Sequence, residues 1–234
     1  MKPIFLNADL GENESALRTR SMMRVIDLAN IACGGHTGSI ASMRFAVVEA
    51  LKNGVKIGAH PGLPDRAGFG RSTEPVSSEL LECIIVSQIS ALATIARSIG
   101  AKLHHVKLHG ALYHAVESSP VLAATYLQTV EQFFPRLGVI ARLGGEVEKF
   151  SDVFGLRIFR EAFVDRAYDD FGNLIPRNQP DALIRTRAAV VAQARRLVTD
   201  GISGLGRPDT LCVHGDTPGA LQIAHAVSTV LSHR

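Results

Sequence analysis

Tryptophan is absent from this 234-residue sequence, and aromatic residues make up only 6% of it. A surface that stacks nucleic-acid bases needs aromatic rings, so this composition argues against such a platform. The formal net charge is only +3, and the lysines and arginines form no run. Both features differ from those of a typical nucleic-acid-binding domain. We therefore expect no nucleic-acid partner.

Cysteines and long apolar runs are also scarce. Cys33, Cys83 and Cys212 are odd in number and far apart, with no CxxC pair, which is typical of reduced thiols rather than of a disulfide framework. No stretch approaches the roughly 20 consecutive apolar residues of a membrane-spanning helix. The apolar segment near the start is too short for a signal peptide. We expect a cytoplasmic protein that does not interact with a membrane.

The sequence does contain seven short apolar stretches that lead into polar, titratable residues. Helix-like segments separate most of them, with the clearest runs over 40–53, 78–99 and 185–200. Apolar strands that alternate with helices indicate parallel βα units, and the length and the 46% hydrophobic content suit one domain spanning 1–234. The seven stretches are Pro3–Asn7, Val25–Cys33, Val55–Ala59, Leu103–Leu108, Leu137–Ala141, Leu156–Phe163 and Thr210–Val213.

Strand parity places several polar residues on a common side. Successive strand residues face opposite sides of a sheet, and in parallel α/β folds ligands bind where the carboxyl ends of the strands converge. Polar residues that face one interior from several strands favour a closed (β/α) barrel over an open, doubly wound sheet. The residues that share a face within each strand are Asn7 with Asp9, His105 with Lys107 and His109, and Cys212 with His214 and Asp216.

Three motifs in the first third of the chain are candidates for chemistry. In Asn7–Glu12, Asp9 can act as a general base and Glu12 can orient a ligand, although Asp9 can equally cap a helix. His36 follows a glycine-rich turn that allows the backbone to approach a ligand closely, and His60 is followed by Pro and Gly at the end of its strand. The alternative for both histidines is a structural role in a tight turn.

Three further motifs follow later in the chain. Burying Lys107 inside a barrel is unfavourable unless an anion meets it. Lys107 therefore either binds a substrate carboxylate or polarises a substrate carbonyl, or it pairs with a buried Asp or Glu. His109 can shuttle a proton. Arg166 suits bidentate binding of a carboxylate or phosphate, or pairs with Asp165. Asp216 either caps the last helix or orients His214.

Taken together, these motifs resemble one family, the LamB/YcsF family, which contains the A subunit of bacterial ATP-dependent 5-oxoprolinases. The resemblance runs in order along the whole chain. It implies a seven-stranded, distorted TIM-like barrel of the glycoside hydrolase/deacetylase type. The matching stretches are Asn7–Glu12 (NADLGE), Asn30–Gly34 (NIACG), Gly58–Gly62 (GAHPG), Gly68–Arg71 (GFGR), His104–Lys107 (HHVK), His109–Tyr113 (HGALY), Asp165–Tyr168 (DRAY), Pro176–Ile184 (PRNQPDALI) and Cys212–Asp216 (CVHGD).

The resemblance also implies the reaction, in which 5-oxo-L-proline, ATP and water give L-glutamate, ADP and phosphate, with partner subunits B and C. This sequence has no GxxxxGK[ST] phosphate loop, so we expect ATP to bind wholly or partly on those partners. Residue roles are hypotheses, with no metal ligand assigned and a divalent metal left open. The expected catalytic residues are Asp9, His36, Lys107 and His109, and the expected substrate-binding residues are Asn7, Glu12, His60, Arg166, His214 and Asp216.

Several positions depart from the usual family pattern, and they flank the expected site. The family commonly has an aromatic residue where Gly35 stands and an acid where Ser39 stands. Leu108 replaces a usual Pro, and His114 replaces a usual Asn. These changes leave the predicted fold intact and bear on the substrate.

Two other classes of function remain open from the residues. One is a stand-alone, metal-dependent amide or acetyl hydrolase, for which histidines and carboxylates of the expected site would supply the ligands. The other is a non-catalytic subunit that binds 5-oxoproline and delivers it to a partner enzyme. The ligands of the first alternative would be Asp9, His36, His60, His109 and His214.

Overall fold

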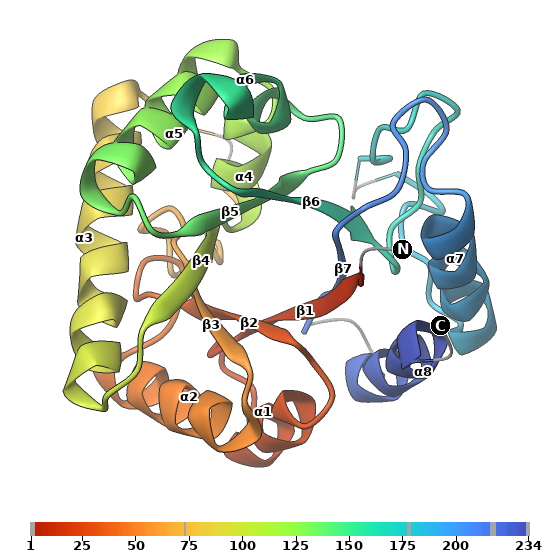
Figure 1. The fold of residues 1–234 in the computed structure, drawn as a ribbon, viewed down its shortest axis with the longest axis horizontal. Coiled ribbons are helices and arrows are strands. Elements are labelled where there is room, and N and C mark those ends of the chain that lie inside the picture. Colours follow the sequence, from red (N-terminus) through yellow and green to blue (C-terminus); the bar gives the residue numbers. More distant parts are fainter. Residues whose placement is uncertain (1–2, 73, 177–178, 216–218, 233–234) are drawn as a thin grey trace.

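The computed structural model describes residues 3–72, 74–176, 179–215 and 219–232. Within them, seven parallel strands follow one another in chain order around a closed barrel, and β7 pairs with β1 (Figure 1). This confirms the closed barrel predicted from strand parity. The strands are β1 Phe5–Leu10, β2 Leu28–Ala32, β3 Lys56–His60, β4 Leu103–Lys107, β5 Gly138–Arg142, β6 Ile158–Phe163 and β7 Thr210–Val213.

Helices surround the barrel on all sides (Figure 1). The three expected runs are present. The second and third each end one residue earlier than predicted, and the third begins two residues later, which is the usual uncertainty of helix ends. Five more helices complete the set, over Ala16–Met23, Gly110–Val116, Pro120–Phe133, Glu146–Phe154 and Ala220–Ser232. The helices are α1 Ala16–Met23, α2 Ile40–Asn53, α3 Ser78–Ser98, α4 Gly110–Val116, α5 Pro120–Phe133, α6 Glu146–Phe154, α7 Arg187–Thr199 and α8 Ala220–Ser232.

Local sequence fixes the ends of α2, which leads into the candidate site. The Ser39 hydroxyl accepts a hydrogen bond from the Ser42 backbone N–H, and the Ser42 hydroxyl accepts one from the Ser39 N–H. This reciprocal pair satisfies two of the donors that every helix start leaves unpaired. Gly54 ends the helix at φ 69°, a left-handed conformation that favours glycine. Ser39 thus has a structural role in place of the family's usual acid.

α3 is long and apolar enough to span a membrane by length and composition, with a mean hydropathy of 1.6 over its best window. Its sequence is not a continuous apolar run, since Ser, Glu, Gln and Arg interrupt it. One face lies buried against the barrel through residues such as Leu81, Ile85 and Ile89. A core helix of a barrel meets the same criterion, so this one helix is weak grounds for a membrane interaction.

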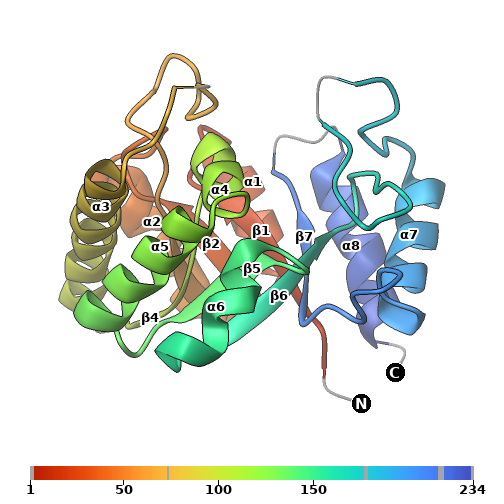
Figure 2. The ribbon, with the colours of Figure 1, turned by 90° about the horizontal axis from the view of Figure 1, so that it is seen from above.

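The interior of the barrel is built in layers. Phe5, Leu28, Ile140 and Phe159 form an apolar layer at the amino ends of the strands. Polar and charged side chains fill the middle, and the candidate site lies at the carboxyl ends. The larger apolar core lies outside the strands, between the barrel and the helices. The connections that follow β3 and β6 rise from the carboxyl end of the barrel (Figure 2), where they can border a ligand site.

Gly58 of β3 lets a histidine from the next strand occupy the interior. A Cβ atom at this position would lie 2.0 Å from Nε2 of His105, whose ring is fully buried and hydrogen-bonded to Asn30. We expect Gly58→Ala to lower the free energy of unfolding by about 3 kcal/mol or more, because a rigid buried ring must shift. Denaturant unfolding measures this.

Gly100→Ala is the matched control for Gly58→Ala. A Cβ atom at Gly100 would meet no heavy atom within 4 Å, and that position carries only the strain of a φ of 79°. The expected cost at Gly100 is therefore about 1 kcal/mol. Equal losses at the two positions would contradict the close approach of β3 to His105.

Candidate active site

A buried ion-pair cluster centred on Lys107 fills the middle of the barrel. Lys107 Nζ lies 3.0 Å from Asp9 Oδ1 and 2.9 Å from Glu161 Oε1. It also donates to Asn7 Oδ1 at 3.3 Å and to Cys212 Sγ at 3.1 Å. All of these side chains are buried. The structure therefore realises the second alternative for Lys107, in which protein carboxylates balance its charge.

Neutral polar groups complete this layer. Asn30 donates to Asn7 Oδ1 and to Asp9 Oδ1, both at 2.8 Å. Asn7 in turn donates to Glu161 and to the Thr210 hydroxyl. Because each buried polar group has a partner, the network holds the Asp9 carboxylate in one orientation below the pocket.

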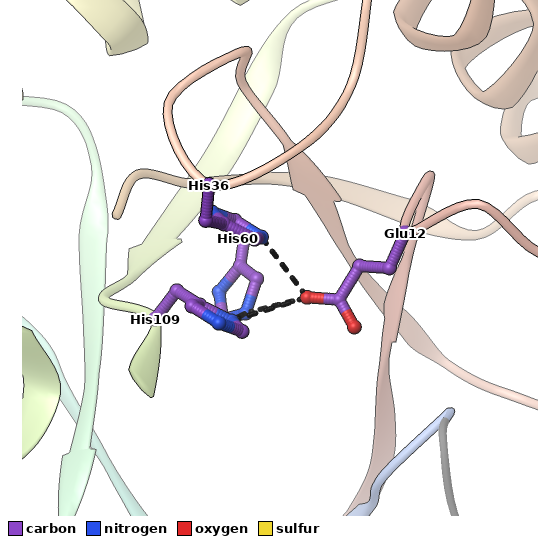
Figure 3. Close-up of side chains that lie close together, drawn as sticks. All are labelled: Glu12, His36, His60 and His109. Atoms are coloured by element: carbon purple, nitrogen blue, oxygen red, sulfur yellow. Dashed lines mark hydrogen bonds and ion pairs between the residues drawn. The ribbon is translucent and has the colours of Figure 1, made fainter. Parts of the chain in front are cut away.

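A second cluster is formed by Glu12, His36, His60 and His109 (Figure 3). It adjoins the first, since His60 Nε2 lies 3.5 Å from Asp9 Oδ2. One carboxylate oxygen, Glu12 Oε1, lies 3.1 Å from His36 Nε2, 3.1 Å from His109 Nδ1 and 3.5 Å from His60 Nε2. The rings of His36 and His109 are stacked, with centroids 3.6 Å apart. We call these four side chains the histidine cluster.

Backbone carbonyls orient two rings of the histidine cluster. His60 Nδ1 lies 2.8 Å from the carbonyl oxygen of Lys107, and His109 Nε2 lies 2.9 Å from that of Phe69. Since a carbonyl can only accept, each of these nitrogens carries the hydrogen. The opposite nitrogens, which are 3.1 Å apart, point toward Glu12. When neutral, each ring therefore has one tautomer that satisfies its carbonyl.

His214 forms a third unit with Asp165 on the other side of the mouth. Asp165 accepts from the His214 backbone N–H at 3.2 Å and lies 2.9 Å from His214 Nδ1. The His214 ring stacks on Phe163 with centroids 5.2 Å apart. One carboxylate therefore fixes both the backbone and the ring of His214.

A pocket of about 360 Å³ connects these units at the carboxyl end of the barrel. Asp9, Glu12, His60, His109 and His214 all line it. The pocket also has arginines, aromatic rings and apolar side chains in its wall, including Arg71, Tyr113, Phe163, Arg166 and Leu174. It combines a few converging polar groups with an apolar surface, as small-molecule sites do.

Comparison with known proteins identifies the family to which this chain belongs. The model of the LamB/YcsF family matches residues 4–234. The chain belongs to the LamB/YcsF family. It is 40% identical to a Bordetella pertussis protein named as the A subunit of 5-oxoprolinase, over 97% of this chain and 94% of that protein.

Solved structures agree with this assignment. The structure of a lactam utilization protein from Thermus thermophilus superposes with a TM-score of 0.89 at 37% identity, covering 100% of this chain and 97% of that one. A family 4 carbohydrate esterase from Streptomyces lividans superposes with a TM-score of 0.51 at 14% identity, covering 99% of this chain and 88% of that one. The second likeness shows the fold alone.

Burial and ion pairing set the charges of this LamB/YcsF site. Burial alone would lower the pKa of Lys107, but the Asp9 and Glu161 carboxylates outweigh it and hold that pKa well above its ordinary value. Burial would raise the pKa of Asp9, but His60 and Lys107 hold it well below its usual range. Burial raises the pKa of Glu161. Of the two carboxylates on Lys107, Asp9 is therefore the one that stays ionised most readily.

The histidine cluster and His214 differ in charge. Burial lowers the pKa of His60 to about 3, so its ring is neutral. Burial would raise the pKa of Glu12, but hydrogen bonds with His109 and His36 lower it to about 2. At His214 burial acts to lower the pKa, and the Asp165 carboxylate outweighs it and raises that pKa above 6.5. His214 thus holds a proton more readily than His60 does.

Local packing explains why a glycine stands at position 35 of this chain, where the resemblance leads us to expect an aromatic residue. A Cβ atom there would lie 2.4 Å from both Gln88 Nε2 and the carbonyl oxygen of Gly62. Gln88 accepts from the Gly62 N–H and donates to the Gly62 carbonyl. This two-way bond from α3 holds the turn that follows His60, and it occupies the space that a side chain at position 35 would need.

Nine of the ten predicted site residues come together at one end or in the interior of the barrel, and Asp216 lies outside the described residues. Sequence reasoning assigns no role to Asn30 or Glu161, which complete the Lys107 cluster, or to Arg71 in the pocket wall. Parity along β6 offers a signal for Glu161, because a charged residue between Phe159 and Phe163 shares their inward face. The sequence predicts that Asp165 can pair with Arg166. In the structure, Asp165 forms an ion pair with His214.

Proposed function

We propose that this chain is the A subunit of an ATP-dependent 5-oxoprolinase, which converts 5-oxo-L-proline to L-glutamate while ATP is hydrolysed to ADP and phosphate. The observation that carries the proposal is the likeness, over 97% of this chain, to a protein named as the A subunit of 5-oxoprolinase. The relative named as a lactam utilization protein supports it, because 5-oxoproline is a five-membered lactam.

The pocket suits a small anionic lactam. Its volume of about 360 Å³ lies at the lower end of the range for small-molecule sites. Two arginines line it, Arg71 and Arg166, and a guanidinium group binds a carboxylate through two parallel hydrogen bonds. Because Asp9 and Glu161 already balance Lys107, we assign the substrate carboxylate to the arginines rather than to Lys107.

The lactam carbonyl of 5-oxoproline is a poor electrophile, so the reaction requires that it be activated. Transfer of the γ-phosphoryl group of ATP to the amide oxygen releases ADP and makes the ring carbon open to water. Addition of water and cleavage of the C–N bond release the amine as an acyl phosphate forms, and hydrolysis of the acyl phosphate gives glutamate and phosphate. The ring nitrogen must gain a proton as it leaves, and the attacking water must lose one.

Two units of the site are placed for these proton transfers. Asp165 raises the pKa of His214, so this ring supplies the proton to the leaving nitrogen. The Asp9 carboxylate lines the pocket in an orientation fixed by Asn30 and Lys107, and we assign it as the group that takes the proton from water.

The name of the relatives supports the proposed partners, and the sequence supports the proposed place of ATP binding. The word subunit in that name implies an assembly, and we propose 5-oxoprolinase subunits B and C as the partners. Since the sequence lacks a GxxxxGK[ST] loop, we propose that ATP binds wholly or partly on those partners. The free thiols of Cys33, Cys83 and Cys212 support a cytoplasmic location.

The test measures glutamate formation and ADP release from 5-oxoproline and ATP, first with this chain alone and then with subunits B and C. We expect activity in the complete mixture only, with one ADP released per glutamate. Omitting ATP is the matched control and should abolish turnover. Glutamate formation by this chain alone without ATP would contradict the proposal.

A stand-alone, metal-dependent hydrolase is the second candidate, because the histidine cluster offers three imidazoles and a carboxylate. Release of acetate or amine from N-acetylated substrates by this chain without ATP would favour it. Binding of 5-oxoproline with no turnover, in the presence of partners that are active with a known A subunit, would instead favour a delivery role.

A further inference from the structure

The histidine cluster has too many acceptors for the donors that its geometry provides. His60 and His109 each direct an N–H at a backbone carbonyl, which leaves lone pairs on His60 Nε2 and His109 Nδ1 in the neutral rings. These two nitrogens lie 3.1 Å apart. Glu12 Oε1, a third acceptor, lies 3.5 Å and 3.1 Å from them. Three buried acceptors at these distances repel one another unless a proton or a metal ion lies among them.

The surrounding hydrogen bonds match those of a metal site. A histidine that binds a metal usually donates its other N–H to a carbonyl or a carboxylate, which fixes the ring and aims its lone pair at the ion. Lys107 and Phe69 supply these carbonyls here. The loop that carries Glu12 is held as well, because the Glu14 carboxylate accepts from the backbone N–H groups of Gly11 and Glu12.

The distances fit a small tetrahedral ion. Zinc bonds of about 2.0–2.1 Å in a tetrahedron separate the ligand atoms by roughly 3.3 Å. The ligand atoms of the cluster are 3.1 Å apart in three pairs and 3.5 Å apart in a fourth. We infer that Glu12, His36, His60 and His109 bind one divalent transition-metal ion of the zinc type. Three imidazoles disfavour Mg²⁺ or Ca²⁺, which take oxygen ligands.

His36 is the ligand that must adjust. Its ring is parallel to that of His109 to within 1°, and two stacked rings cannot both aim in-plane lone pairs at one ion. Among the described residues, His36 Nδ1 has no hydrogen-bond partner, so a turn of this ring breaks no bond at that atom. Glu12, His60 and His109 are therefore the preformed ligands, and His36 completes the set by rotating.

A second group of potential ligand atoms, close to the histidine cluster, already contacts a cationic side chain of the protein. Asp9, Cys212 and His214 also offer three ligand atoms close together. There, however, Lys107 Nζ already donates to Asp9 Oδ1 at 3.0 Å and to Cys212 Sγ at 3.1 Å. The ammonium group occupies the position of a cation, so this group carries no metal. In the histidine cluster the groups that contact Glu12 Oε1 are the three imidazoles themselves.

The test is metal content, measured on this chain alone and without ATP or 5-oxoproline, so that its failure leaves the proposed reaction untouched. The chelator-treated chain is dialysed against Zn²⁺, passed through gel filtration and analysed for zinc. We expect one zinc per chain, and at least a tenfold fall in His60→Gln and His109→Gln. His225→Gln removes an exposed histidine of α8 and should retain one zinc.

Two further measurements keep the inference open to refutation. Cobalt(II) in place of zinc should give the intense visible bands of a four-coordinate ion in the wild type and in His225→Gln. Zinc should raise the unfolding temperature of those two proteins only. If a His60 or His109 variant fails to fold, Glu12→Gln and His36→Gln are assayed in the same way. Absence of retained zinc, or retention unchanged in the variants, would overturn the inference.

Discussion

Replacing Lys107 with methionine is expected to lower the free energy of unfolding by about 3–5 kcal/mol, because it leaves two buried carboxylates without their cation. Asp9 and Glu161 each lie within 3.0 Å of the Lys107 ammonium group, and both are almost completely buried. Methionine fills a similar volume and donates no hydrogen bond. Chemical denaturation of the wild type and Lys107→Met at neutral pH measures the loss.

The same substitution should reduce glutamate formation in the complete assembly by roughly 100-fold or more, because Lys107 fixes the Asp9 carboxylate at the base of the pocket. The stability loss has an internal check. Lys107→Met combined with Glu161→Gln removes one of the two stranded charges and should recover at least about 1 kcal/mol. Full activity of Lys107→Met would remove Lys107 from the functional site.

Lys52→Met is the matched control for a lysine in an ion pair. Lys52 Nζ lies 2.9 Å from Glu49, but 61% of its side chain is exposed. A pair so open to solvent contributes no more than about 1 kcal/mol, and it lies on α2, away from the pocket. Equal losses from Lys52→Met and Lys107→Met would contradict the account of the Lys107 cluster as a buried network.

The barrel could be predicted from sequence because burial on both faces makes each parallel strand a short apolar run. Parity then placed Asn7, Asp9 and Lys107 on the inner face, and the structure brings all three together. The helices α4 and α6 were harder to predict. They are seven and nine residues long, which is too short for apolar periodicity to stand out.

The partners within the site could not be predicted, since they depend on strand register and loop paths rather than on spacing. Glu161 reaches Lys107 because β6 lies two strands from β4 in the closed barrel and both side chains point inward. His36 meets His109 because Gly62 and Gly70 let the two loops approach closely, with a Cβ atom at either glycine falling within 3.0 Å of His36. Sequence indicated that histidines would gather at this end, without indicating which atoms would meet.

Asp165→Asn is expected to lower kcat/KM for glutamate formation by about 10²–10⁴-fold, the usual contribution of a positioned general acid. Asparagine keeps the shape of the side chain but removes the charge that raises the pKa of His214. In the wild type, kcat/KM should fall as the pH rises through that raised pKa. In Asp165→Asn this fall should move to lower pH, and a pH–rate profile shows the shift.

The same charge links folding to pH. Because the folded-state pKa of His214 lies above its ordinary value of 6.5, its contribution to stability is fully present below about pH 6.5 and is lost as the pH rises through the folded-state pKa. Asp165→Asn should remove this dependence. NMR titration of the His214 ring in both proteins separates a lowered pKa from a displaced ring.

Asp169→Asn is the control from the same segment. Asp169 is exposed and accepts hydrogen bonds from the backbone of Phe171 and Asn173, so its replacement should leave both kcat/KM and the pH profile unchanged. If Asp165→Asn lowered activity without moving the pH profile, His214 would be a positioning residue for Phe163 and the pocket wall, and the proton for the leaving nitrogen would have to come from another group. A shifted profile with a folded protein ties the proton to the His214 ring, because no merely structural loss moves an apparent pKa in step with that of one histidine.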